Sequence, residues 1–141
     1  MIGAGMLVAC QVAINSRLRD TVDSPGLSAL ISFAVGTAAL ATVVYSEQLG
    51  GAGRGLASIR LAPWWAFLGG IFGAAYVVLS IVALPRLGTA VVVVATVTGQ
   101  LIASLLIDSL GWFGVQPVPL TWWRGAGAAL LILGLLLLVR R

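Results

Sequence analysis

Residues 89–107 read TAVVVVATVTGQLIASLLI, an apolar run that contains no charged residue. A helix needs roughly 20 such residues to cross the roughly 30 Å hydrocarbon layer of a membrane. A transmembrane β-strand would alternate apolar and polar residues, which this run does not. The run therefore predicts a membrane-spanning helix and an all-α integral membrane fold.

Similar apolar stretches lie on both sides of this run. Ser24-Pro25-Gly26 separates the first two, a turn at 85–88 precedes the run, and prolines at 117 and 119 follow it. The first stretch lacks basic residues before its apolar part, so we expect a retained helix and not a cleaved signal. One transmembrane domain over 1–141 is predicted, with spans at 1–15, 27–45, 64–84, 89–107 and 125–139.

Composition supports this class and excludes several others. The chain of 141 residues is 60% hydrophobic and only 9% charged, whereas soluble domains are about 25% charged. The net charge of +4 comes from scattered arginines, which do not form a nucleic-acid-binding patch. The chain has no His, and Cys10 is its single cysteine, so we expect no metal site, no cofactor and no enzyme activity. The glycine-rich string at 50–55 lacks the phosphate-loop pattern and predicts a flexible connection.

Arginines are almost balanced between the two membrane sides that five spans would create. Five arginines fall on one side and three on the other, a weak bias that permits insertion in both orientations. All the tryptophans fall on the side with fewer arginines, near helix ends, where anchoring at the headgroup level is favoured over stacking on a solute. They are Trp64, Trp65, Trp112, Trp122 and Trp123.

Polar side chains within two of the spans are the candidates for a binding cavity, because polar groups are costly in a bilayer. Each set repeats every four residues along one helix face. Two interpretations have equal weight: the side chains bind a polar solute, or they form hydrogen bonds between helices. The first set is Gln11 and Asn15; the second is Thr96, Gln100, Ser104 and Asp108.

A face of small residues in the third span predicts close helix packing, within the bundle or in a dimer. Gly69 to Gly73 and Gly70 to Ala74 follow the small-xxx-small pattern. Tyr76 lies further along the same span and is expected to reach the same interior.

No acidic residue lies in the middle of a span, which argues against a simple proton antiporter. Asp108 lies at a helix end, where we expect it to end the helix or pair with an arginine in preference to coupling an ion. This pattern favours neutral or zwitterionic solutes, or facilitated passage, over proton-driven export of cations.

The ordered motifs resemble the YdcZ-like family of the drug/metabolite transporter superfamily, over the whole chain. A departure from the pattern is Trp112, where a smaller aliphatic residue is expected. The resemblance rests on Gly5, Gln11, Asn15 and Leu18, Ser24-Pro25, Ser32-Phe33 and Gly36, Pro85, Leu87-Gly88, Gly99-Gln100, Asp108, Gly111, Phe113-Gly114, Arg124, Gly127 and Gly134.

The resemblance implies a five-helix half-transporter in the bacterial inner membrane. One half does not enclose a pathway, and transporters commonly place the substrate between inverted repeats. We therefore expect an antiparallel dimer, with a second copy or a related chain, that moves a small molecule. The alternative is a non-transporting subunit that assembles or stabilises a larger membrane complex.

Overall fold

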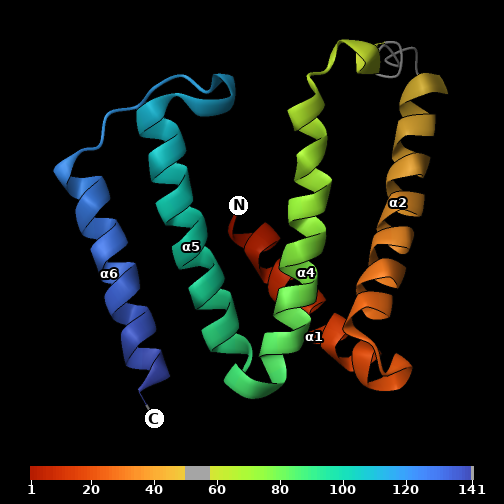
Figure 1. Ribbon diagram of the computed structural model, residues 1–141, viewed down its shortest axis with the longest axis horizontal. Helices are drawn as coiled ribbons and strands as arrows, with labels where there is room; N and C mark the ends of the chain where they lie inside the picture. The colour runs from red at the N-terminus through yellow and green to blue at the C-terminus, as the bar shows by residue number, and fades with distance from the viewer. Residues whose placement is uncertain (50–57, 141) are drawn as a thin grey trace. The chain divides into compact units, whose positions relative to one another are not determined.

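The computed structural model describes residues 1–49 and 58–140. All the long elements in this part of the chain are helices (Figure 1). The glycine-rich string at 50–55, predicted to be a flexible connection, lies outside the described residues. The long helices are α1 (Ile2–Val22), α2 (Pro25–Leu49), α4 (Leu68–Leu87), α5 (Thr89–Leu110) and α6 (Trp122–Val139); the short 3-10 helices are η1 (Ile59–Leu61), η2 (Trp64–Phe67) and η3 (Trp112–Gly114).

Four of these helical segments are long and apolar enough to cross a membrane: Pro25–Leu49, Trp64–Leu87, Thr89–Leu110 and Trp122–Val139. Within them, at most 17% of the most apolar 18-residue window is buried inside the chain. Large apolar side chains therefore face outward along each span, as contact with lipid requires. The all-α membrane fold predicted from the sequence is confirmed.

The first helix differs from its predicted limits. It continues past Asn15 to Val22 and carries Arg17, Arg19 and Asp20, because charged residues end an apolar segment without breaking a helix. For that reason α1 is not among the four apolar spans described. The fifth membrane crossing stays a prediction.

The break between α1 and α2 follows from three consecutive residues. Asp23 adopts the left-handed conformation with φ 52° and ends α1. The Ser24 hydroxyl accepts a hydrogen bond from the Leu27 N–H at 3.2 Å, and Pro25 occupies the first position of α2, where its missing N–H costs nothing.

The connection between α4 and α5 is shorter than the sequence predicts. Helix α4 continues through Pro85 to Leu87, and the predicted four-residue turn reduces to Gly88 with φ 81°. A proline near the end of a helix removes one hydrogen bond but leaves the last turn in place. With ψ at 158°, Gly88 adopts a positive-φ extended conformation that residues with a side chain rarely adopt.

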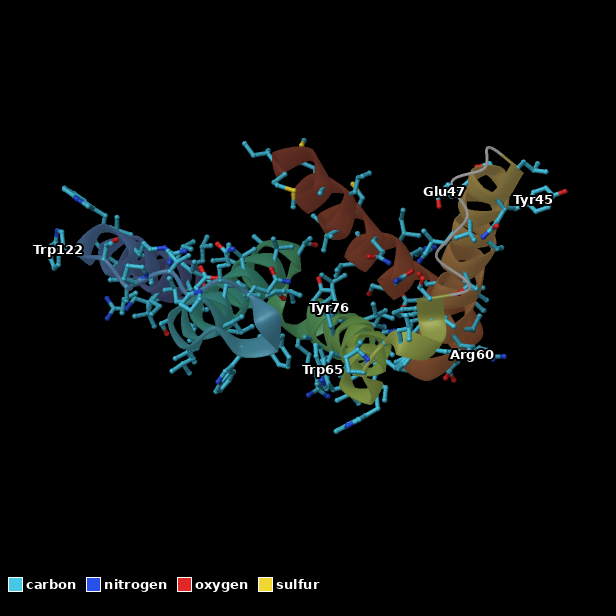
Figure 2. The ribbon with its side chains drawn as sticks, turned by 90° about the horizontal axis from the view of Figure 1, so that it is seen from above. Tyr45, Glu47, Arg60, Trp65, Tyr76 and Trp122 are labelled. Atoms are coloured by element: carbon cyan, nitrogen blue, oxygen red, sulfur yellow. The ribbon has the colours of Figure 1, made fainter. Side chains whose placement is uncertain are left out.

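The chain divides into two compact units, Met1–Pro85 and Arg86–Arg141. In the first, α1 packs against α2, and the two helices diverge from their shared connection (Figure 2). A small apolar cluster of Ala29, Val77 and Ile81 joins α2 to α4. In the second unit, α5 and α6 pack as an antiparallel hairpin (Figure 1).

Candidate solute-binding site

An ion pair joins the two helices of the second unit. The Arg124 guanidinium donates through Nη2 to Asp108 Oδ2 at 2.5 Å, with side-chain exposures of 34% and 25% respectively. The pairing with an arginine that the sequence favours for Asp108 is therefore present. The other terminal nitrogen, Arg124 Nη1, is buried and has no hydrogen-bond partner among the described residues.

The connection between the two helices supports this pair. Gly111 ends α5 in the left-handed conformation and donates its N–H to the Ile107 carbonyl. The Val118 N–H donates to the backbone carbonyl of Asp108 at 2.8 Å. On α6, the Thr121 hydroxyl accepts the Arg124 N–H and caps the helix. Backbone hydrogen bonds at Asp108 and at Arg124 therefore fix the positions from which the two charged side chains extend.

A cavity of about 290 Å³ lies beside the pair, between α5 and α6. Leu101, Ser104, Leu105 and Asp108 follow the i, i+3, i+4, i+7 spacing of one helix face, and the facing residues of α6 repeat it. The cavity therefore combines an apolar wall with one hydroxyl and both signs of charge. The residues contributed by α6 are Arg124, Gly127, Ala128 and Leu131.

The two charges occupy the helix ends that disfavour them. Asp108 lies in the last turn of α5 and Arg124 in the first turn of α6, whereas the helix dipole favours a cation at the former and an anion at the latter. Each position costs about 0.3–1 kcal/mol, and an ion pair this exposed to solvent contributes only about 0–1 kcal/mol. The pair therefore adds little net stability.

A second cavity, of about 200 Å³, lies within the first unit between α1 and α2. Gln11 faces Ser32 and Thr37 across it, and Gly36 adds no side chain to its wall. Phe33 and Leu40 complete the lining. The lining of this cavity is mostly apolar with three uncharged polar side chains, and it contains one of the residues predicted from the sequence, Gln11.

Asn15 lies one turn along α1 from Gln11 and is buried, with 4% exposure. Its backbone carbonyl accepts the Ser28 hydroxyl at 2.7 Å, a bond between α1 and α2. Its side-chain Nδ2 is buried without a partner among the described residues. Asn15 thus contributes to helix packing through its backbone carbonyl, while its side-chain N–H donor has no acceptor among the described residues.

The remaining predicted residues have other positions. Thr96 is half-buried and Gln100 exposed on α5, and neither lines the two cavities described here. Tyr76 packs against the cluster of Ala29, Val77 and Ile81. Ser104 does line a cavity, next to Asp108. The solute-binding role predicted for these residues stays a prediction.

The face of small residues on α4 is largely open within the first unit. A Cβ added to Gly69 or Gly70 would meet no atom within 4 Å, while one at Gly73 would meet the Phe33 ring at 3.6 Å. Ala74 is exposed. Packing of this face against a second chain stays a prediction.

The tryptophans lie at the positions expected of interface anchors. Trp122 and Trp123 begin α6 with exposures of 77% and 81%, and Figure 2 shows Trp122 extending outward from the helix start. Trp112, the departure from the family pattern, lies edge-to-face with Phe113 at a centroid distance of 6.5 Å.

Comparison with known families shows to which class of membrane protein this helical bundle belongs. A family model described as "Putative inner membrane exporter, YdcZ" matches residues 1–137. The chain belongs to this family. The resemblance drawn from the motifs is thereby confirmed, and the YdcZ-like chain is a multi-pass protein of the inner membrane. No curated protein and no solved structure matches it.

The sequence patterns did not assign Arg124 to the candidate site. The predicted span at 125–139 left Arg124 just outside the last helix, although Thr121 three residues earlier is a helix-capping signal that places Arg124 in the first turn of α6. Ser32 and Thr37 were also missed as cavity residues, because isolated hydroxyls in apolar helices usually bond their own backbone.

Proposed function

We propose that this YdcZ-like chain is one half of a dimeric secondary transporter that moves a small molecule across the inner membrane. The observation that carries the proposal is the Asp108–Arg124 pair on the wall of the α5–α6 cavity. Charges that add little stability, at helix ends that disfavour both, are explained by a role in binding or passage. The exporter description of the family supports the same function.

The second half would come from a second copy or a related chain in the opposite orientation. A single α5–α6 hairpin leaves most of its surface uncovered, and transporters commonly form their pathway between two inverted repeats. The nearly even distribution of arginines permits both orientations. The open face at Gly69 and Gly70 would allow close approach of a second backbone.

The test is whether water reaches the α5–α6 cavity in the membrane. In a Cys10→Ser background, Ser104→Cys places a thiol in the cavity, and Ile102→Cys places one on an exposed apolar part of the same helix, outside the cavity lining. Thiols react as thiolates, which form in water and not in lipid. We expect a small polar thiol reagent to modify Ser104→Cys at least tenfold faster than Ile102→Cys.

A second pair of variants tests the α1–α2 cavity in the same way. Gln11→Cys lines that cavity, while Ile14→Cys lies on an exposed apolar position of α1. If Ser104→Cys and Gln11→Cys were both as inert as their controls, the cavities would be closed to water. The transport function would then be wrong, and the alternative of a non-transporting subunit would take its place.

A further inference from the structure

We infer that the α5–α6 cavity binds a small zwitterion, a molecule that carries one anionic and one ammonium group on an apolar body. The inference names a substrate class for the transport function proposed above and therefore rests on it.

The Asp108–Arg124 pair favours ligands that carry both a positive and a negative charge. A ligand with a single charge that bound one partner would leave the other without its counter-ion, a cost that the partial exposure of the pair reduces but does not remove. A zwitterion avoids this cost, because its anion replaces Asp108 on the guanidinium while its ammonium replaces Arg124 on the carboxylate. The exchange keeps every charge paired.

The unpartnered nitrogen of Arg124 supports such an exchange. Nη2 bonds the carboxylate while Nη1 is buried without an acceptor, so the guanidinium uses only part of its hydrogen-bonding capacity. A carboxylate or phosphate can accept from both terminal nitrogens at once. A ligand anion that drew the guanidinium toward it would therefore supply the acceptor that Nη1 lacks.

The rest of the cavity sets the size and the body of the ligand. Its volume of about 290 Å³ is near the lower end of the roughly 300–1,000 Å³ typical of small-molecule pockets, which suits a ligand as small as an amino acid. Leu101, Leu105 and Leu131 form the apolar wall, and Ser104 adds one hydroxyl. This lining fits an apolar side chain beside a polar, doubly charged head.

Two sources share this chemistry: a free amino acid, and the ammonium and phosphate of a phosphatidylethanolamine head group. The test measures thermal unfolding of the full chain in nanodiscs of phosphatidylglycerol, since a ligand that binds the folded state raises the midpoint. The probes are leucine, methionine and phenylalanine. Their amides carry only the ammonium group, and their N-acetyl forms carry only the carboxylate.

We expect at least one of the amino acids to raise the midpoint at concentrations at least tenfold lower than either of its singly charged analogues. Gly127→Leu should abolish the response, because a larger side chain there would enter the cavity without meeting an atom near its Cβ. Gly125→Leu, at an equally open glycine outside the cavity lining, should keep it. The ligand series on the unchanged chain does not depend on how either variant folds.

A second set of nanodiscs distinguishes the sources. If the occupant is the lipid head group, adding phosphatidylethanolamine should itself raise the midpoint of the unchanged chain but not of Gly127→Leu. If it is a free solute, the added lipid should leave the response to the amino acid intact. The inference is wrong if neither the amino acids nor the lipid stabilises the chain more than singly charged analogues, or if Gly127→Leu keeps the full response.

These outcomes are separable from those of the transport proposal. A Ser104→Cys thiol that reacts with the polar reagent, in a chain that shows no preference for zwitterions, would overturn the site and leave transport standing. Zwitterion binding together with thiols that are inert in the membrane would support the binding site and overturn the transport proposal.

Discussion

Arg124 Nη2 donates to Asp108 Oδ2 at 2.5 Å and so ties the first turn of α6 to the last turn of α5. The bond crosses a connection that is itself anchored to the Asp108 carbonyl by the Val118 N–H. This end of the hairpin therefore carries both the ion pair and the backbone contact to Asp108, and it lies beside the α5–α6 cavity.

Exchanging the two charges tests the argument from helix dipoles. Asp108→Arg alone places two cations together and should lower the free energy of unfolding by about 1–2 kcal/mol. The double exchange D108R/R124D restores the pair and gives each helix end the charge it favours. We expect thermal unfolding, followed by tryptophan fluorescence, to show the double variant at least as stable as the unchanged chain. A double variant no more stable than Asp108→Arg would contradict the dipole argument.

Gly111 should be the least replaceable glycine of the fourth connection. Its φ is 67°, and a Cβ there would lie 2.9 Å from Pro117 Cγ. Gly111→Ala combines strain with a clash and should cost about 1–3 kcal/mol of unfolding free energy. The control, Gly125→Ala, lies in a helix with open space around it and should stabilise by about 0.5–1 kcal/mol. Equal effects of the two changes would show that the turn is not constrained as described.

Ser28 should be sensitive to size more than to polarity. Its side chain is fully buried, with 0% exposure, and its hydroxyl donates to the Asn15 carbonyl. Ser28→Ala loses one interhelical bond, about 0.6 kcal/mol in a membrane, whereas Ser28→Leu forces α1 and α2 apart at about 1–3 kcal/mol. Ser46→Ala, at an exposed serine of the same helix, is the control and should change little. The packing described here is wrong if Ser28→Leu is tolerated as well as Ser46→Ala.

Orientation in the membrane can be measured with compartment-specific reporters fused after Arg141. An antiparallel homodimer requires one chain to insert both ways, which the balanced arginines permit, so we expect substantial signal from both reporters. Adding two arginines to one connection should shift the ratio. Signal from one compartment alone would exclude the homodimer and direct attention to a related partner chain of opposite orientation.

The fold class could be predicted from the sequence because apolar runs such as 89–107 have few alternatives in a membrane. Helix limits were harder: α1 extends to Val22, since nothing in the chemistry of Arg17 or Asp20 stops a helix. Hydropathy indicates where an apolar span ends, whereas a capping residue such as Ser24 indicates where the next helix begins.

The candidate site could be predicted only in part. Gln11, Ser104 and Asp108 were found because polar residues at four-residue spacing are conspicuous in an apolar helix. Arg124 was not assigned to the site, because its partnership with Asp108 depends on how the 111–121 connection folds back. That fold depends on Gly111 and Pro117 meeting in space, which local sequence patterns do not encode.

The most direct test of the account is counterflow exchange by the purified chain in liposomes. Vesicles preloaded with an unlabelled amino acid that stabilises the chain would be diluted into the same compound in labelled form. We predict transient accumulation of label with the unchanged chain and with Gly125→Leu, and none with Gly127→Leu, whose added side chain fills the α5–α6 cavity. Accumulation no greater than in protein-free liposomes, or full exchange by Gly127→Leu, would contradict passage of a zwitterion through this cavity.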